Sequence, residues 1–331
     1  MKWGAAFGTL AGLALAAWLL ASYGLGTVLG LLHQAGWGIL PVVLFHFVQI
    51  LFSALAWRAV AGPMRPQPTL GEYLSLRWIR EGVNNLLPVA QIGGEVVAAR
   101  LLRRRGVPLT AAVAGSVGDL TMEMLTQVLF TLIGLALLVL LVGESGVGGY
   151  ILGGAGVAAL GAIGFVAAQW FGLAGWIERG VMRLSVRFGW ATPGELGGDA
   201  GSLDDALRAL YRAPSRMAWA CTHHSLSWLL GGIEVCLALH VLGTDVGFGE
   251  GLVIEALGQA LKAAGFAIPG AIGVAEGGYV VVCHLFGLAP ELAIALGLVK
   301  RLREVVLGIP ALIAWQVLEA RPASPAGRTA A

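Results

Sequence analysis

Six segments of the chain are apolar over about 20 residues or more, which is the length that an α-helix needs to cross a lipid bilayer. They cover residues 3–22, 38–60, 109–142, 148–171, 217–242 and 291–318. Only 12% of the residues are charged, about half the share of an ordinary soluble domain. The apolar runs also lack the ten-residue alternation of barrel strands. We therefore expect an all-α polytopic membrane protein with six spanning helices, and we exclude a water-soluble enzyme and a nucleic-acid-binding protein.

The distribution of Lys and Arg predicts the orientation of these spans. Arginines are concentrated between the second and third spans and between the fourth and fifth, whereas the connections around 23–37, 143–147 and 243–250 contain no Lys or Arg. Cytoplasmic loops carry the excess of positive charge. We expect a multi-pass protein of the bacterial inner membrane, with both termini and an amphipathic linker, residues 173–216, on the cytoplasmic side. The first span is expected to remain as a helix and not to be a cleaved signal peptide.

Two further apolar segments are interrupted in their middle. Residues 70–105 contain Pro88 followed by two glycines, and residues 251–287 contain Pro269 followed by Gly270. Proline ends a helix because it removes a backbone hydrogen bond. The flanking charges place both ends of the first segment inside and both ends of the second outside. We expect two re-entrant hairpins of broken helices, which enter the membrane from opposite sides.

The two interrupted segments match at a constant offset of 181 residues. The offset relates five pairs of residues: Gly62 and Gly243, Pro88 and Pro269, Glu95 and Glu276, Gly106 and Gly287, and Glu123 and Glu304. Three crossings separate the starts of the two units, so the units have opposite topology. We interpret the chain as one transmembrane domain, residues 1–331, that contains an inverted repeat with units 38–143 and 217–320. This pattern is typical of transporters.

Polar residues at membrane depth are the candidate site, because an intramembrane charge is costly and usually marks a pathway. Asp119 and Glu123 share one face of a predicted helix, and the first hairpin offers side chains that both donate and accept hydrogen bonds. The expected substrate-binding residues are Asn84, Asn85, Gln91, Glu95, Arg100, Asp119, Glu123, Glu276, Lys300, Arg303 and Glu304. We expect them to line one central cavity that admits a polar headgroup.

Some of these residues have a plainer interpretation. Asp119 and Lys300 are related by the offset and opposite in charge, so they could form a structural ion pair across the repeat axis. Arg100, with Arg103 and Arg104, suits a phosphate or carboxylate headgroup, but cytoplasmic positive charge alone would also explain it. Both alternatives stay open at this stage.

Metal-ligating and catalytic motifs are absent from the sequence. The adjacent His223 and His224 point in different directions on a helix, so they are expected at the edge of a span and not in a shared metal site. The three cysteines have no metal-binding spacing. We therefore expect no metal and no cofactor.

The residues between Arg77 and Glu95, followed by Asp119, resemble the first signature of the flippase-like transmembrane domain of the lysylphosphatidylglycerol synthase family. The residues 268–276 and the pair Lys300 and Arg301 are similar to its second signature. The length resembles stand-alone members that are associated with hopanoid biosynthesis. The resemblance implies a membrane domain that translocates lipids. Full-length synthases add a soluble transferase domain, which this sequence lacks, so we expect no synthase activity.

The leading functional hypothesis is a flippase that moves a polar-headgroup lipid, a hopanoid or a phospholipid, between leaflets. One alternative is a membrane-embedded enzyme that modifies lipid headgroups, with Glu95 or Glu276 as general base. Another is a secondary transporter for a small solute. The expected partner is a membrane lipid, and the candidate protein partners are a second copy of the chain, as a homodimer, or the machinery of hopanoid or other lipid biosynthesis.

Overall fold

The computed structural model describes residues 25–87, 93–142, 200–264 and 271–321. Within these ranges all regular elements are helical. In chain order they are α2 (Leu25–Ala35), the short 3-10 helix η1 (Gly36–Gly38), α3 (Ile39–Ala61), α4 (Leu70–Leu86), α5 (Gly93–Arg104), α6 (Leu109–Val142), α9 (Ala200–Tyr211), α10 (Pro214–Val241), α11 (Phe248–Ala264), α12 (Val274–His284) and α13 (Pro290–Ala320). The predicted all-α class is confirmed for this part of the chain.

Among the described residues, three helical segments are long and apolar enough to cross a membrane, and they cover Gly26–Ala61, Leu109–Val142 and Pro214–Val241. They contain three of the six predicted spans. Helix α13 covers a fourth, but it carries several charges in its middle. The predicted spans 3–22 and 148–171 lie outside the described residues, as do Pro88, Gln91, Pro269 and most of the linker 173–216.

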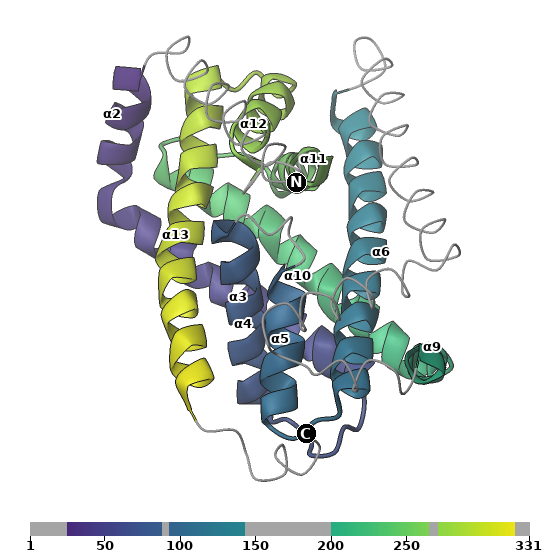
Figure 1. The fold of residues 1–331 in the computed structure, drawn as a ribbon. Coiled ribbons are helices and arrows are strands. Elements are labelled where there is room, and N and C mark those ends of the chain that lie inside the picture. The colour runs from purple at the N-terminus through teal and green to yellow at the C-terminus, as the bar shows by residue number, and fades with distance from the viewer. Residues whose placement is uncertain (1–24, 88–92, 143–199, 265–270, 322–331) are drawn as a thin grey trace, which may run out of the picture.

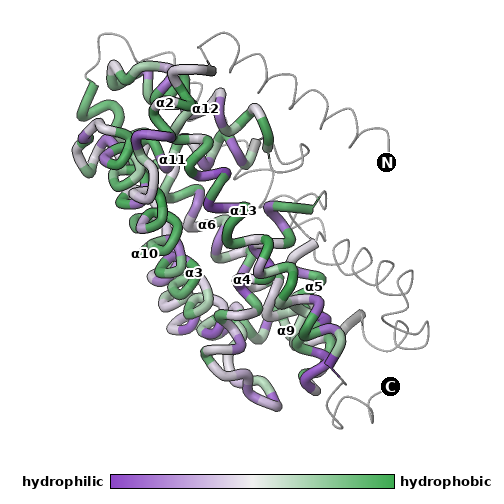
Figure 2. The backbone as a smooth tube through the Cα atoms, turned by 90° about the vertical axis from the view of Figure 1, so that its left-hand side faces the viewer, coloured by the Kyte–Doolittle hydropathy of each residue, from purple (hydrophilic) through white to green (hydrophobic). Residues whose placement is uncertain are grey.

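Helices α3 and α10 pack against each other along much of their length, and the two interrupted segments lie toward opposite ends of the molecule (Figure 1). The pair α4–α5 lies toward the end where α13 finishes, and the pair α11–α12 lies toward the end where α13 begins. A second view agrees with this placement (Figure 2). Helix α4 packs on α13, and α11 packs on α6. The first helix of each pair therefore packs on the long helix of the other half of the chain, whereas the second helix, α5 or α12, packs on the long helix of its own half.

The helix boundaries repeat at the offset found in the sequence. Helices α5 and α12 begin 181 residues apart, at Gly93 and Val274, and α6 and α13 begin 181 residues apart, at Leu109 and Pro290. The backbone turns also correspond. Gly62 and Gly243 both have positive φ, as do Gly106 and Gly287. Glycine tolerates this conformation better than other residues. The glycines that matched at the 181-residue offset therefore stand at backbone turns in equivalent positions of the two units.

Local sequence explains where several helices begin. Thr69 accepts a hydrogen bond from the backbone N–H of Glu72, whose side chain accepts one from the backbone N–H of Thr69, and this capping box starts α4. Pro214 and Pro290 stand in the first turns of α10 and α13, where a missing N–H costs nothing. These caps fix where the helices that carry the site begin.

Large apolar side chains remain exposed on the outer faces of α6 and α13. They include Leu125, Leu129, Leu132, Leu140, Leu302, Ile309 and Ile313. An exposed apolar surface of this extent is expected where helices contact lipid. None of the charged side chains of the same two helices is exposed, and four of them are buried, so polarity is directed inward, as expected for helices in a bilayer.

Two local predictions differ from the structure. Residues 23–37 were expected to be a connection, but Leu25–Ala35 form helix α2, which packs against α13. The absence of Lys and Arg there indicates which side a segment faces and not whether it is helical. Within the linker 173–216, Ser202 suits an N-cap and Pro214 a helix end, which predicts a helix of about ten residues between them. Instead α9 already begins at Ala200, and Pro214 opens the next helix.

Helices α4 and α13 approach closely at Gly82. A Cβ atom added there would lie 2.8 Å from the Cβ of Ala311 and 3.2 Å from the carbonyl oxygen of Gly308. The indole N–H of Trp78 donates to the carbonyl oxygen of Leu307 at 2.9 Å beside the same crossing. Glycine at position 82 thus allows a backbone contact that a larger residue would prevent.

We expect Gly82→Ala to lower the free energy of unfolding by about 1–3 kcal/mol, because it overpacks this crossing. Gly71→Ala is the matched control in the same helix, since a Cβ at Gly71 meets nothing within 4 Å and alanine favours helix there. Denaturant titration in detergent measures both variants. Equal stability of the two would contradict the close approach.

Candidate functional site

A group of buried charged side chains surrounds Arg80, which we name the arginine cluster. Its members come from α4, α5, α6 and α10, and they are Arg77, Arg80, Glu95, Asp119, Glu123 and His224. Arg80 is 2% exposed. It donates to Glu95 at 2.9 Å, to Glu123 at 2.8 Å and to Asp119. One guanidinium therefore joins carboxylates from two helices, which Arg can do because its five N–H donors point in several directions.

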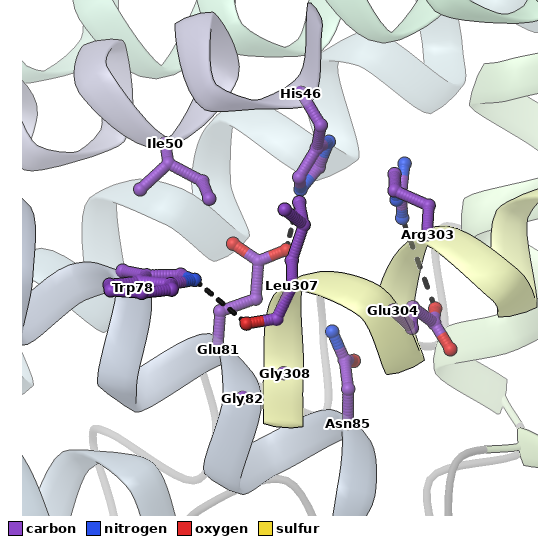
Figure 3. Close-up of a pocket in the computed structure, with 10 residues that line it drawn as sticks. All are labelled: His46, Ile50, Trp78, Glu81, Gly82, Asn85, Arg303, Glu304, Leu307 and Gly308. Carbon is purple, nitrogen blue, oxygen red and sulfur yellow. Dashed lines mark hydrogen bonds and ion pairs between the residues drawn. The ribbon is translucent and has the colours of Figure 1, made fainter. Parts of the chain in front are cut away.

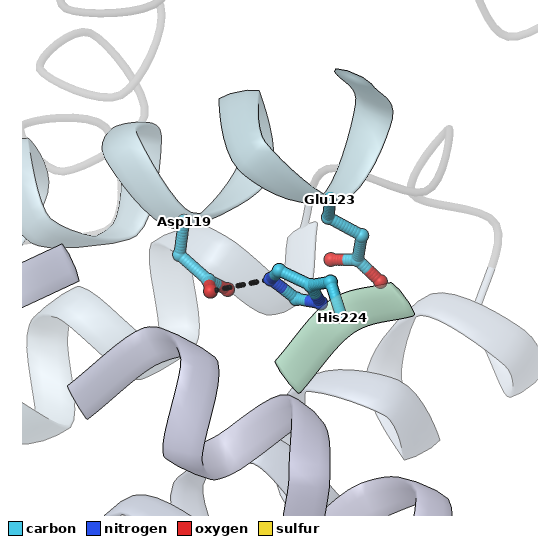
Figure 4. A group of neighbouring side chains, drawn as sticks. All are labelled: Asp119, Glu123 and His224. Atoms are coloured by element: carbon cyan, nitrogen blue, oxygen red, sulfur yellow. Dashed lines mark hydrogen bonds and ion pairs between the residues drawn. The ribbon is translucent and has the colours of Figure 1, made fainter. Parts of the chain in front are cut away.

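The remaining members of the arginine cluster complete the pairing. Arg77 donates to both carboxylate oxygens of Glu123, at 2.8 and 2.5 Å. His224 Nε2 lies 3.0 Å from an oxygen of Asp119 (Figure 4). Bidentate contacts of this kind are among the stronger ion pairs in proteins. His224 is buried, and its ring faces α6 and not the outer surface.

Asp119, Glu123 and His224 are also side-chain types that ligate metals, and their nearest ligand atoms lie within 4.8 Å of one another. Both carboxylates, however, already receive guanidinium donors from Arg77 and Arg80. In this conformation the positive charge that a metal would supply is supplied by arginine. We therefore describe this group as an ion-pair cluster.

A second group is centred on His46 of α3, and we name it the histidine triad. Its members are Glu81, His46 and Glu234. The two ring nitrogens of His46 contact different carboxylates, Nε2 with Glu81 at 2.6 Å and Nδ1 with Glu234 at 2.9 Å. Glu234 has no exposed surface, and it also accepts hydrogen bonds from Gln49 at 2.5 Å and from Arg303.

The third group lies where α11, α12 and α13 meet, and we name it the lysine cluster. Its members are Glu255, Lys262, Glu276, Lys300, Arg301 and Glu304. Lys300 donates to Glu255 at 2.5 Å and Lys262 donates to Glu304 at 2.6 Å. Arg301 reaches Glu304 at 2.7 Å and Glu276 at 3.3 Å. Arg303 links this cluster to the histidine triad, since it contacts both Glu234 and Glu304.

Two small cavities adjoin these groups. The polar residues around the first are His46, Glu81, Asn85, Arg303 and Glu304 (Figure 3). Those around the second are Gln259, Lys262, Glu276, Lys300, Arg301, Arg303 and Glu304. Each has a volume of about 10 Å³, which is close to what one water molecule needs. Arg303 and Glu304 line both cavities and so stand between them.

The predicted site residues are divided between these groups. Glu276, Lys300, Arg303 and Glu304 share the second cavity, and Asn85 lines the first. Asn84 contacts Glu95 at 3.3 Å and accepts from the backbone N–H of Gly94 at 2.8 Å. The single cavity expected to hold Glu95 and Asp119 as well is not seen in the described residues. Those two carboxylates lie in the arginine cluster instead.

The expected pair of Asp119 and Lys300 does not form. Asp119 binds Arg80 and His224, whereas Lys300 binds Glu255. The physical reason is that each charge finds a partner within its own half of the chain: α4 brings Arg80 to Asp119 of α6, and α11 brings Glu255 to Lys300 of α13. The partners come from helix packing, which the offset between two residues does not specify.

Arg100 lies apart from both cavities. It donates to Glu319 near the end of α13, at 2.9 Å through Nε. Arg104 donates to the carbonyl oxygen of Glu319, also at 2.9 Å. These contacts fasten the end of α5 to the end of α13, where carbonyl groups lack helical partners.

Three central residues had not been singled out from the sequence, namely His46, Glu234 and Glu255. Each is a lone ionisable residue within a long apolar stretch. Such residues are expensive in a membrane and usually functional, so their position within predicted spans and hairpins was a usable signal. The spacing of Asp119 and Glu123 predicts site residues on α6, whereas the residues of the histidine triad lie on α3, α4 and α10.

Chemically, the site offers alternating positive and negative groups around small polar cavities inside an apolar protein. Such groups can replace water around a charged headgroup or a proton. No curated protein and no solved structure matches the chain. Residues 5–311 match the family described as the lysylphosphatidylglycerol synthase TM region, a match that covers most of the chain, and the protein therefore belongs to that family of membrane proteins.

Proposed function

We propose that the protein is a lipid flippase, which moves a polar-headgroup lipid, a phospholipid or a hopanoid, between the leaflets of the bacterial inner membrane. Membership of a lipid-related membrane family supports a lipid substrate. The observation that carries the proposal is the second cavity, where Lys262, Lys300 and Arg301 face Glu276 and Glu304. Charges of both signs at this depth suit a headgroup that must leave water to cross.

The proposal includes an inverted repeat of broken helices, with both termini cytoplasmic. It is supported by the 181-residue offset of helix boundaries and by the exchange of partners, in which α4 packs on α13 and α11 on α6. In transporters of this type the two halves move against each other around the substrate site. The first cavity is lined by residues of both halves, and the second, which lies within the second half, adjoins it through Arg303 and Glu304. The paired charges would then separate as a headgroup enters, because the cavities now hold about one water molecule each.

The test uses the full-length protein in vesicles of phosphatidylcholine and phosphatidylglycerol with a trace of fluorescent phospholipid. Dithionite destroys fluorescence in the outer leaflet only, so the rate at which inner-leaflet lipid becomes sensitive measures translocation. We expect Glu276→Gln to lower this rate about tenfold, which corresponds to a transition-state loss of about 1.4 kcal/mol. The amide keeps the side-chain shape and can still accept the hydrogen bond from the Gly273 N–H.

Glu250→Gln is the matched control. Glu250 also accepts from a glycine three residues earlier, Gly247, at 2.8 Å, but at the exposed start of α11. We expect it to translocate at the wild-type rate. If wild type and Glu276→Gln move lipid equally, Glu276 has no part in transport. If the lipid returns with a changed headgroup mass, the protein is an enzyme.

A further inference from the structure

The two contacts of His46 require one proton more than a neutral imidazole supplies. A neutral imidazole has a single N–H, and an ionised carboxylate can only accept. His46 nevertheless lies 2.6 Å from Glu81 and 2.9 Å from Glu234 through different nitrogens. Two hydrogen bonds need two hydrogens, so either the imidazole is doubly protonated or one carboxyl group is protonated. The histidine triad therefore holds an additional proton in either case.

The charges of the residues around the triad also indicate that it holds one additional proton. The fixed cations that contact it are Arg303 and, at 3.7 Å from Glu234, Lys300. Lys300 also neutralises Glu255. The charge of Arg77 also acts on Glu81, but both oxygens of Glu123 already pair with Arg77. The three carboxylates of Glu81, Glu234 and Glu255 thus face two fixed cations within contact distance and leave one negative charge uncompensated.

With the additional proton this buried group is neutral. The rest of the lysine cluster is already balanced, because Lys262 and Arg301 match Glu276 and Glu304. An uncompensated buried charge is expensive, so the geometry and the charge balance both favour the protonated triad.

The triad also has a route for its proton. His46 and Glu81 line the first cavity together with Arg303 and Glu304, and the side chain of Glu81 is 24% exposed. The cavity volume of about 10 Å³ accommodates about one water molecule. Arg303 and Glu304 line the second cavity too, which is where we place the headgroup. The proton and the headgroup would therefore act on the same two side chains.

We propose that Glu81, His46 and Glu234 form a buried proton-binding site, and that the proton it holds is the ion coupled to lipid movement. The coupling rests on the flippase function proposed above. Release breaks one N–H or O–H bond of the triad and passes the proton to cavity water. The negative charge that remains faces Arg303 from α13 and lies beside Glu304, so loss of the proton changes the charge balance of the headgroup cavity. Movement of the lipid then follows the proton gradient.

The coupling is tested in the same vesicles with a pH difference of one unit across the membrane. If one proton moves with each lipid, the fluorescent phospholipid should reach about a tenfold concentration difference between leaflets, because one pH unit is a tenfold proton ratio. Without the pH difference it should distribute evenly. The leaflet that becomes enriched distinguishes co-transport from exchange.

Glu81→Gln should abolish this asymmetry, because its amide can donate to the imidazole and the variant no longer carries the uncompensated charge, so no additional proton is needed. His46→Gln should abolish it as well, because the variant lacks the imidazole that takes up and releases the proton between the two carboxylates. His240→Gln is the control, since His240 is also bonded to a carboxylate, that of Asp245, but its side chain is 69% exposed. It should keep the full asymmetry. Lipid that moves in wild type without responding to the pH difference would overturn the coupling and leave the flippase function intact. Failure of wild type to move any lipid would instead reject the flippase function.

The proton site itself is tested without transport on the purified full-length protein. Nitrogen NMR of labelled histidine should show a doubly protonated imidazole that is lost in His46→Gln. Alternatively, infrared spectroscopy should show a protonated carboxyl band that is lost in Glu81→Gln or Glu234→Gln. One of the two signals must be present near neutral pH. The absence of both would overturn the proposed site, whatever the vesicles show.

Discussion

Replacing Arg80 with methionine is expected to lower the free energy of unfolding by about 3–5 kcal/mol, because it removes one partner of a buried ion-pair group. Methionine fills much of the space but cannot donate a hydrogen bond. The carboxylates of Glu95, Asp119 and Glu123 would each lose a guanidinium contact. Arg77 contacts two of the three, Glu123 and, at 3.6 Å, Asp119, so Glu95 should suffer the most.

Denaturant titration in detergent measures this loss. Arg65→Met is the control, since Arg65 is exposed and surface substitutions usually change stability by less than about 0.5 kcal/mol. Arg80→Lys should fall between the two, because an ammonium group keeps the charge but cannot reach three carboxylates with the geometry of a guanidinium. A methionine variant as stable as the Arg65 control would show that the arginine cluster does not hold these helices together.

The second large effect is expected at Glu234. Glu234→Gln should cost about 3 kcal/mol or more, since it removes the buried carboxylate that pairs directly with Arg303 and that contacts His46 and Gln49. Adding Arg303→Met to this variant should recover part of the loss, because the unmatched cation is then removed. The double-mutant cycle should give an interaction energy of about 2 kcal/mol between the two residues.

The exposed pair His240 and Asp245 supplies the reference cycle, which should give less than about 1 kcal/mol. Two losses that simply add would contradict a direct Glu234–Arg303 interaction. A double variant less stable than Glu234→Gln alone would contradict the expected recovery. Both cycles use the same unfolding measurement.

The positions of the helices could be predicted from the sequence more accurately than the side-chain contacts between them. The span 109–142 coincides with α6, and the interruptions near Pro88 and Gly270 separate α4 from α5 and α11 from α12. These features depend on apolar length and on backbone chemistry, which are local. Helix α2 was missed because it lies within a stretch without charges, where the orientation signal carries no information about structure.

The partners of the site residues depend on packing between helices far apart in the sequence. The spacing of Asp119 and Glu123 correctly places both on one face of α6, but it cannot indicate that α4 brings Arg80 to that face. His46 meets Glu81 and Glu234 only because α3 lies against both α4 and α10. A lone ionisable residue in an apolar segment indicates that a buried polar contact exists there. The residue that forms the other side of this contact can be identified only from the packing of the helices.

Residues that are separated by the repeat offset of 181 positions differ in charge between the two halves of the chain. Glu81 corresponds to Lys262, Asp119 to Lys300, and Ser53 to Glu234. Two identical halves would adopt inward-facing and outward-facing arrangements of equal energy by symmetry. These halves are not identical, so the two arrangements differ in energy and one of them dominates at rest. In the proposed flippase, the unequal distribution of charge thus sets which conformation the resting protein adopts, whereas net lipid movement still requires a gradient.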